Sequence, residues 1–532
     1  MLGWHREPRT GRLRCVRLPF CHHSARRAKE FACVHSAPTR RTVTTISMRP
    51  TAVPDLEKMP VPPLRRSREI QGNVLAAFNK DYMAFRYVRF PDDNGAGGRG
   101  WLSVMLNTVS VTAAVEDFNE EFSLSRRAYG QDPSITATWV GVSLTCSGLL
   151  RVAREPDKVK QDLASFPSFV EGAAARAADL GDDGTSAPDH WLFGGERNAV
   201  DAVLIVAADT ETALNEKLDN IAAADSAHGV TVVHQDDGRT LTGDLRGHEH
   251  FGYKDGISQP GVKDFHREDR DNPGFRENRP GARLVEPGEF VFGHRSESGD
   301  PPPARPKWLD NGSLQVVRRL RQDVGGWNEA VVREAGKFTP NGIAPETLGA
   351  CLVGRKKNGT PLDPGENPLT GVGSSANDFT YENDGEGRHT PCAAHIRRTH
   401  PRHFEPSQRH RIMRRGIPYG PLYTPQTPDQ DRGLMFVCYG TSLEQQFEFV
   451  QKFWSNHPGF LPGTKGAPNG IDKVTGKTAD GNPDARIVLA DGHEGTVSMD
   501  RFVRTTGAVY AFTPSVSTLR KLAANESLNT KG

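Results

Sequence analysis

Two stretches in which short β-rich runs alternate with helical patterns constrain the fold most, and a segment rich in Pro, Gly and charge separates them at 264–312. In the first stretch, runs of β-branched and aromatic residues predict strands, and apolar residues at helical spacing predict helices. The predicted strands span 83–90, 101–106, 138–144, 202–208 and 230–234, and the predicted helices span 111–122 and 211–221.

The second stretch repeats this alternation. Two halves that each mix antiparallel-capable strands with a few helices are typical of an α+β protein built from two similar units. We expect an N-terminal domain at 68–265, a linker at 266–312, a C-terminal domain at 313–525 and a short tail at 526–532. The predicted strands of this half span 289–292, 314–320, 394–397, 434–439 and 509–512, with helices at 326–334, at 442–454 and after residue 515, and a polar loop at 355–390.

Composition excludes several classes of protein. The chain of 532 residues, 36% of them hydrophobic, can bury one large or two ordinary cores. Its longest purely apolar run, 202–208, is far shorter than the roughly 20 residues of a membrane-spanning helix. Residues 1–50 hold ten Arg and one Lys against two Glu, so the remainder carries net negative charge. A negative body argues against a general nucleic-acid binder, whose surface would be basic.

Residues 1–67 form a basic and then Pro-rich extension, which we expect to be disordered or to act in targeting. Residues 51–66 are too rich in Pro to pack and indicate a linker. The extension lacks the apolar run of a secretory signal, so an intracellular or organelle location is slightly favoured over an extracellular one. It fits an organelle transit peptide and a translated leader upstream of a true start at Met48 equally well.

Cysteine spacing gives no sign of a disulfide framework or of a structural zinc site. Four cysteines outside the extension are scattered without a CxxC pair, and we expect buried thiols. They are Cys146, Cys351, Cys392 and Cys438.

Three segments hold residues that could carry chemistry. In HEHFGYKDGISQP (248–260), Gly252 and Gly256 flank Asp255. Such glycines permit a tight turn or the close approach of a flat ligand, and Asp255 would project from a fixed loop. The same pattern also fits a plain Asp-Gly turn.

The second segment, CAAHIRRTHPR (392–402), places His395 after small residues. A neutral imidazole at the edge of a strand could bind a metal or a haem iron there, although a lone His is more often a surface or core residue. Other histidines follow and precede it without any recognised zinc spacing. They are His389, His400, His403 and His410.

The third segment, RIMRRGIPYG (411–420), contains Arg414. An arginine stays protonated and directs several donors, so it could supply fixed positive charge to a cavity. Paired arginines at the end of a strand are also commonly solvated or bound to a carboxylate.

In this order and on this scale, the three segments resemble the dye-decolorizing peroxidase family. The resemblance covers about residues 68–525 and leaves out the first 50 or so. It extends to EIQGNVLAAFNKDYMAFRYVRF (69–90), NGSLQVVRRLRQDV (311–324), GLMFVCYGTSLEQQFEFVQKFW (433–454) and AVYAFTPSVSTLR (508–520).

The resemblance implies two ferredoxin-like units with antiparallel sheets that enclose one haem b per chain. It makes His395 the axial ligand below the iron, and Asp255 and Arg414 the pair above it. It places Leu434 and Phe436 in the apolar wall on that side, and Gly252 and Gly256 beside the cofactor. His400 departs from the family, in which an Asn is common at that place. The acceptor that holds the other nitrogen of His395 is not evident from the sequence.

The implied activity is a haem peroxidase that reduces hydrogen peroxide and oxidises dyes, phenolics or similar aromatic donors by one-electron steps. An ionised Asp255 could move a proton between the two peroxide oxygens, and Arg414 would favour that ionised state and stabilise developing negative charge. Bulky donors would need an aromatic relay to the surface. The candidates for that relay are Trp308, Trp327, Trp454, Tyr381 and Tyr423.

Two other functions compete with this one. A protein that binds or handles haem with little turnover would need His395 but would tolerate the loss of Asp255. A non-haem metal protein would use the histidine cluster and would bind its metal without a haem absorption band. The presence of both Asp255 and Arg414 favours the enzyme.

Overall fold

The computed structural model describes residues 3–6, 13–16, 61–129, 135–301, 305–362, 377–402, 405–461, 469–478 and 482–529. The chain divides into two units, residues 1–59 and residues 60–532. In the first unit, β1 (Gly3–Arg6) pairs with β2 (Leu13–Val16) in an antiparallel hairpin. The rest of this unit, including Cys21, Cys33 and Met48, lies outside the described residues.

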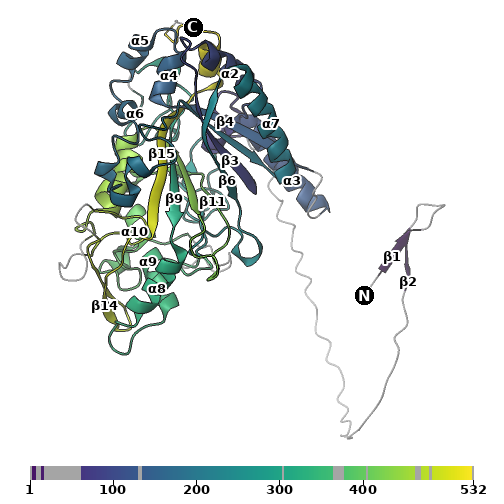
Figure 1. Ribbon diagram of the computed structural model, residues 1–532. Coiled ribbons are helices and arrows are strands. Elements are labelled where there is room, and N and C mark those ends of the chain that lie inside the picture. The colour runs from purple at the N-terminus through teal and green to yellow at the C-terminus, as the bar shows by residue number, and fades with distance from the viewer. Residues whose placement is uncertain are drawn as a thin grey trace. The chain divides into compact units, whose positions relative to one another are not determined.

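The second unit is built on one nine-stranded sheet that takes strands from both halves of the chain (Figure 1). Its strand order is β10-β12-β11-β6-β3-β5-β4-β15-β9, and β9 also pairs with β12, so the sheet closes on itself. Every pairing in it is antiparallel. The strands are β3 (Tyr82–Arg89), β4 (Thr138–Leu144), β5 (Ala202–Ala208), β6 (Thr231–Arg239), β9 (Ser313–Gln322), β10 (Met413–Arg414), β11 (Ile417–Tyr419), β12 (Gly433–Gly440) and β15 (Val503–Thr513).

Helices cover the outer face of this sheet, and smaller strand pairs lie outside it. The pairs are β7 (Gly261–Val262) with β8 (Leu284–Val285), and β13 (Ala485–Val488) with β14 (Glu494–Val497). The helices are α1 (Gly72–Leu75), α2 (Ala96–Leu106), α3 (Thr112–Tyr129), α4 (Cys146–Val152), α5 (Pro156–Asp162), α6 (Pro167–Glu171), α7 (Glu211–Ala227), α8 (Val324–Ala335), α9 (Pro345–Val353), α10 (His395–Thr399), the π-helical η12 (Leu443–Phe447) and η13 (Val450–Ser455), and α11 (Val516–Ala523).

Strand β5 shows why the core has two layers. All seven of its residues are buried, because alternate side chains enter two different apolar clusters. Leu204 and Val206 pack outward against α2 and α7, whereas Val203 and Ile205 pack inside the closed sheet. A run that is apolar on both faces is therefore what a central strand of this sheet requires.

These findings confirm the prediction of an α+β fold with antiparallel sheets. The predicted linker at 266–312 falls between β6 and β9, and the sheet runs across that stretch because β6 pairs with β11 and β4 with β15. The compact unit begins before the expected domain start at residue 68, because Leu64 is already buried and its N–H donates to the carbonyl of Asp264.

Three strand predictions are wrong. Residues 101–106 belong to α2, in which Trp101, Leu102 and Met105 are buried and Val104 is exposed, the spacing of one helical face. Residues 289–292 form no strand, because a short 3-10 turn at Pro287–Glu289 leads into three consecutive buried apolar residues. Residues 395–397 belong to the start of α10, and Ala394 is its N-cap.

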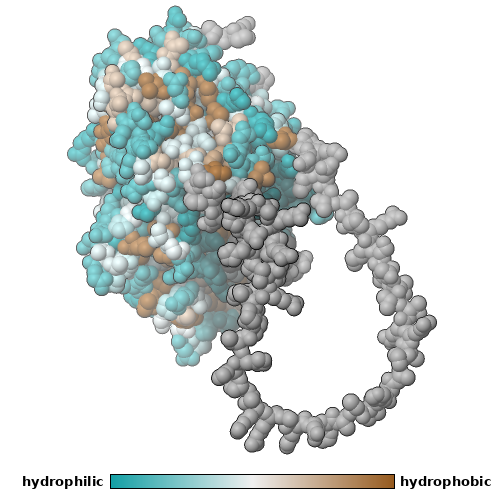
Figure 2. All heavy atoms as spheres, turned by 90° about the vertical axis from the view of Figure 1, so that its right-hand side faces the viewer, coloured by the Kyte–Doolittle hydropathy of each residue, from teal (hydrophilic) through white to brown (hydrophobic). Residues whose placement is uncertain are grey.

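Among the described residues, each helix is too short or too polar to cross a bilayer. On the face seen in Figure 2, hydrophobic residues lie in small separate groups between hydrophilic ones. The four cysteines of this unit are buried free thiols, as predicted.

Candidate active site

A cavity of about 250 Å³ is lined by strands β9 and β12 of the sheet and by the helical segments α10, η12 and η13. Five of the seven predicted site residues line it, although they come from four distant parts of the chain. They are Asp255, His395, Arg414, Leu434 and Phe436. The sequence motifs therefore meet at one place in the fold.

Asp255 and Arg414 form an ion pair in this cavity. Arg414 Nη1 donates to Asp255 Oδ1 at 2.9 Å, and Arg414 Nη2 donates to the carbonyl of Ser258 at 3.2 Å. Burial raises the pKa of Asp255, but the charge and hydrogen bond of Arg414 and the N–H of Gly256 outweigh it, so the pKa is lowered overall. Asp255 is therefore an ionised base beside a permanent cation.

The two glycines of this loop serve its backbone conformation. Gly252 has a φ of +88° and Gly256 a φ of +73°, values that side-chain-bearing residues rarely adopt. A Cβ on Gly256 would meet no protein atom within 4 Å, and one on Gly252 would only touch Lys357. Neither glycine lines the cavity, so their predicted place beside a cofactor stays a prediction, and their observed role is to turn the loop that presents Asp255.

His395 is the first residue of α10, and not the edge of a strand as the sequence indicated. Arg397 and Arg398, which follow in the same turn of helix, are both buried. Arg398 donates to the carbonyls of Trp454, His457 and Gly470. These bonds fix the turn from which the His395 imidazole reaches the cavity.

Asp472 holds the imidazole of His395. Its Oδ2 lies 2.7 Å from His395 Nδ1 and accepts from Thr475 Oγ1 at 2.8 Å, while its Oδ1 accepts from the N–H of Val474 at 2.8 Å. Burial lowers the pKa of His395, but the charge and hydrogen bond of Asp472 outweigh it and the pKa is raised. With a proton on Nδ1 directed at Asp472, Nε2 is left with its lone pair for a metal.

Sequence reasoning missed Asp472, which lies 77 residues beyond His395. It stands in the polar stretch NGIDKVTGK (469–477), which matches no motif. The one local signal is an Asp followed by a Thr three residues later, which is common in turns of every kind.

Leu434 and Phe436 line the cavity with apolar side chains. They alternate along β12 with Met435 and Val437, which point into the closed sheet. Leu434 stands opposite Leu320 of β9 in the antiparallel register.

A basic wall faces the same cavity. Arg355, Arg402 and Arg411 line it. Within the described residues, neither Arg402 nor Arg411 forms an ion pair with a carboxylate; Arg402 bonds to Asn377, and Arg411 Nη1 lies 2.9 Å from His400 Nδ1. Burial lowers the pKa of His400 well below its usual range, so it meets Arg411 as a neutral acceptor. Within the described part of the chain, Arg402 and Arg411 thus bring positive charge to the cavity without a bound carboxylate.

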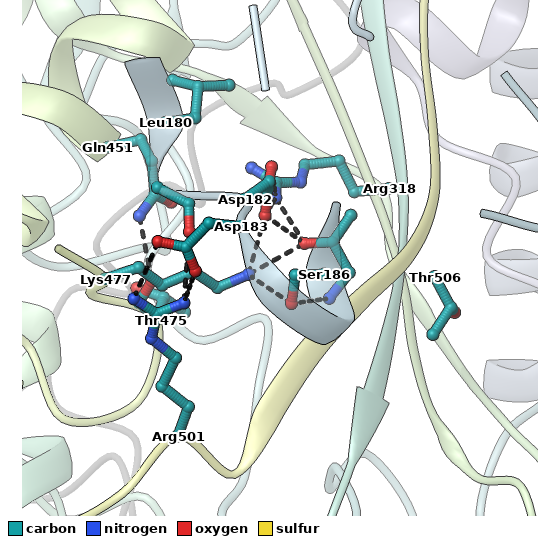
Figure 3. A network of polar contacts seen from close by, with 12 residues as sticks. Leu180, Asp182, Asp183, Ser186, Arg318, Gln451, Thr475, Lys477, Arg501 and Thr506 are labelled. Atoms are coloured by element: carbon teal, nitrogen blue, oxygen red, sulfur yellow. Dashed lines mark hydrogen bonds and ion pairs between the residues drawn. The ribbon is translucent and has the colours of Figure 1, made fainter. Parts of the chain in front are cut away.

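A buried ion network, drawn in Figure 3, contributes two cations to the lining of the cavity. Arg318 Nη2 and Lys477 Nζ donate to Asp182 Oδ1 at 2.6 and 2.7 Å, and Thr505 Oγ1 donates to the same oxygen at 2.6 Å. Arg318 and Lys477 line the cavity, whereas Asp182 comes from the N-terminal half, just after η3 (Ala178–Leu180). One carboxylate from the first half thus holds two cations of the second half.

The aromatic candidates for an electron relay are mostly internal. Tyr423 alone among the five is partly exposed, and it packs against the cluster of α8 and α9. The others lie inside the protein and offer no surface of their own to a bulky donor. They are Trp308, Trp327, Trp454 and Tyr381.

The histidine cluster does not form a metal site among the residues that the structure covers, where no group of three or more possible ligands occurs. His403 lies outside the described residues. His410 instead stacks on Phe449, with ring centroids 3.7 Å apart.

Comparisons with known families match both halves of the chain. A family model described as "DyP dimeric alpha+beta barrel domain" matches residues 69–241, and one described as "Dyp-type peroxidase, C-terminal" matches residues 302–460. Together they include β3 to β6, His395 and Arg414.

Individual proteins are similar over most of their length. A dye-decolorizing peroxidase of Mycena epipterygia is 30% identical over 92% of this chain and 93% of its own. A multifunctional dye peroxidase of Amycolatopsis is 31% identical over 85% of this chain and 95% of its own. The solved structure of an ancestral D-type dye decolorizing peroxidase superposes with a TM-score of 0.71 at 29% identity, covering 86% of this chain and 98% of that one.

Proposed function

The chain belongs to the dye-decolorizing peroxidase family and is a haem-dependent peroxidase that oxidises dyes. We propose that haem b occupies the cavity between His395 and the pair of Asp255 and Arg414. The observation that carries the proposal is that His395, bound to Asp472, and Asp255, bound to Arg414, line one cavity although their motifs lie far apart in sequence.

The walls of the cavity fit the chemistry of haem b, which combines a flat apolar ring with two carboxylates. Leu320, Leu434 and Phe436 offer apolar surface to a ring. Arg402 and Arg411 offer guanidinium groups that hold no carboxylate within the described residues, and carboxylates are the ligands that buried guanidinium groups bind best. We therefore assign these arginines to the propionates.

Haem, when bound, supplies the redox chemistry that accepts oxidising equivalents from hydrogen peroxide and passes them to a donor. His395 would bind its iron through Nε2, while Asp472 fixes the tautomer and the plane of the imidazole. A ligand imidazole that donates to a carboxylate is more basic than one that donates to water, so Asp472 would also raise the electron density that His395 donates.

Asp255 supplies the proton transfer. Because Arg414 keeps its carboxylate ionised, Asp255 accepts a proton from an incoming hydrogen peroxide molecule and returns it to the oxygen that leaves as water. Arg414 remains charged throughout and stabilises the negative charge that develops on that oxygen. Hydrogen peroxide is small enough for this cavity, whereas aromatic donors such as dyes and phenolics would deliver electrons from its rim or from the protein surface.

The test is the rate at which the haem-loaded protein reacts with hydrogen peroxide, followed by stopped-flow absorbance. Asp255→Asn keeps the shape but removes the base, so the rate should fall by roughly 10² to 10⁴. Arg414→Leu removes the cation, so the rate should fall by about 10² to 10³. Asp117→Asn breaks an exposed ion pair with Arg66 and serves as the control, with an unchanged rate.

A loss of less than about tenfold in both Asp255→Asn and Arg414→Leu, with haem still bound, would show that these residues do not form the catalytic pair. The protein would then have to move protons through other groups, and the assignment of this side of the cavity to peroxide would be withdrawn.

A further inference from the structure

The side-chain amide of Gln259 forms two hydrogen bonds with the backbone of Arg414, one to its carbonyl and one to its N–H. Gln259 Nε2 donates to the carbonyl of Arg414 at 3.0 Å, and the N–H of Arg414 donates to Gln259 Oε1 at 3.3 Å. We propose that Gln259 is a positioning residue that fixes the separation of Asp255 and Arg414. The inference rests on the proposed function, because it concerns the same pair.

The backbone of Arg414 in strand β10 needs these two hydrogen bonds. Strand β10 is only two residues long, and it pairs with β12 alone. The N–H of Arg415 donates to the carbonyl of Val437 in β12, and successive residues of a strand direct their N–H and C=O groups to opposite sides. The backbone of Arg414 therefore faces away from β12, and the Gln259 amide takes the place of a neighbouring strand.

The same short loop holds Arg414 at three points. Asp255 binds its Nη1, the carbonyl of Ser258 binds its Nη2, and Gln259 binds its backbone. The loop is anchored at its other side, because the N–H of Asp255 donates to the carbonyl of Gly247. With backbone and guanidinium both tied to one loop, the carboxylate and the cation cannot drift apart independently.

Loss of these two hydrogen bonds should change the electrostatics of Asp255. The charged groups that influence Asp255 are Arg414 on β10, His395 on α10 and Glu249 on its own loop. Arg414 is the largest of the influences that lower its pKa, and burial opposes it. If Arg414 moves away, burial prevails and Asp255 holds its proton at a higher pH.

The fold offers a matched control. Gln71 makes the same pair of bonds to Val142 of β4, with Nε2 donating to the carbonyl at 2.8 Å and Oε1 accepting the N–H at 2.8 Å. Gln71 does not line the cavity. Gln71→Met therefore removes an equivalent pair of hydrogen bonds to the backbone and leaves the pair of Asp255 and Arg414 unchanged.

The experiment compares Gln259→Met and Gln71→Met as haem-loaded full chains. We expect both to lower the unfolding temperature, because each leaves backbone groups without partners. Only Gln259→Met should slow the reaction with peroxide, by about 10- to 100-fold. In that variant the loss of rate in acid should also begin at a higher pH. Gln259→Met should also weaken the binding of cyanide, an anion that probes the positive charge of Arg414, by about tenfold or more. The haem absorbance at equilibrium measures that binding.

Gln259→Asn serves if Gln259→Met does not fold, since it keeps the amide but is one methylene too short to reach both backbone groups. Suppose that the folded Gln259 variant shows the wild-type acid limb and wild-type cyanide binding, while Asp255→Asn reacts slowly with peroxide. This result would overturn the positioning role of Gln259 and leave the proposed function intact. Wild-type rates in Asp255→Asn and Arg414→Leu as well would overturn both.

Discussion

Asp472 Oδ2 lies 2.7 Å from Nδ1 of His395, and this carboxylate is completely buried. The pair joins two segments, α10 and the stretch 469–478, that share no motif. It therefore fixes the direction in which His395 presents Nε2 to the cavity, and it sets the basicity of that nitrogen.

Asp472→Asn should weaken haem binding by about 10- to 100-fold, because a neutral amide neither orients the imidazole as firmly nor stabilises positive charge on it. Haem affinity measured by titration of the haem-free protein checks this expectation. Asp491→Asn, which removes an exposed carboxylate beside His493, is the control and should bind haem as the wild type does. Equal affinity in Asp472→Asn would contradict the assignment of Asp472 as the partner of His395.

The pH dependence of the peroxide reaction follows from the pair of Asp255 and Arg414. The pKa of Asp255 is held below its ordinary value of 3.8, and only the ionised form acts as a base, so the rate should persist into acid and fall only below about that pH. In Arg414→Leu, burial is no longer opposed and the acid limb should shift to higher pH. Stopped-flow rates between about pH 3 and 7 would show the shift, and an acid limb at the wild-type position would refute it.

Asp182 should contribute strongly to stability, because its loss leaves Arg318 and Lys477 side by side and buried. Asp182→Asn should lower the free energy of unfolding by about 3–5 kcal/mol. Asp183→Asn breaks the neighbouring, more exposed pair with Arg501 and should cost about 1 kcal/mol or less. Urea unfolding of both variants gives the comparison, and similar small losses would show that the network in Figure 3 does not stabilise the fold.

The same residue gives a stability effect that depends on pH. The pKa of Asp182 is lowered in the folded state, since Arg318 and Lys477 outweigh its burial. Such a group stabilises the fold above its unfolded pKa, and this contribution is lost as the pH falls through the folded pKa. The difference between wild type and Asp182→Asn should therefore be full at neutral pH and shrink in strong acid.

A chain that starts at Met48 should load haem and unfold as the full chain does. The compact unit begins at residue 60, so the deletion removes none of it. Differential scanning calorimetry and haem content of the two forms check this. A fall of several degrees in the unfolding temperature would show that the first 47 residues take part in the fold.

The sequence predicts strands well where burial is two-sided and helices well where apolar spacing is regular. Residues 202–208 and 211–221 are examples, and both elements form as expected. It fails at 101–106, because an apolar run of six residues fits either structure until its partners are known. In the fold, α7 and α11 cover one side of that run and leave Val104 to solvent, which selects the helix.

The site was predictable to the extent that its residues stand in motifs. Asp255, His395 and Arg414 stand within short patterns of glycine, alanine and arginine, and the fold brings them together. Asp472, Asp182 and Gln259 act through contacts with residues that lie between 77 and 323 positions away. A contact of that range depends on the closed sheet, and no local pattern encodes it.

Haem content per chain shows whether His395 holds a haem in this cavity. Purified wild type, His395→Ala and the exposed control His190→Ala would be passed through gel filtration and their absorption spectra recorded. We expect one haem per chain with an intense Soret band in the wild type and in His190→Ala, and little or none in His395→Ala, because the protein's bond to iron is lost. Full haem content with an unchanged spectrum in His395→Ala would contradict this expectation.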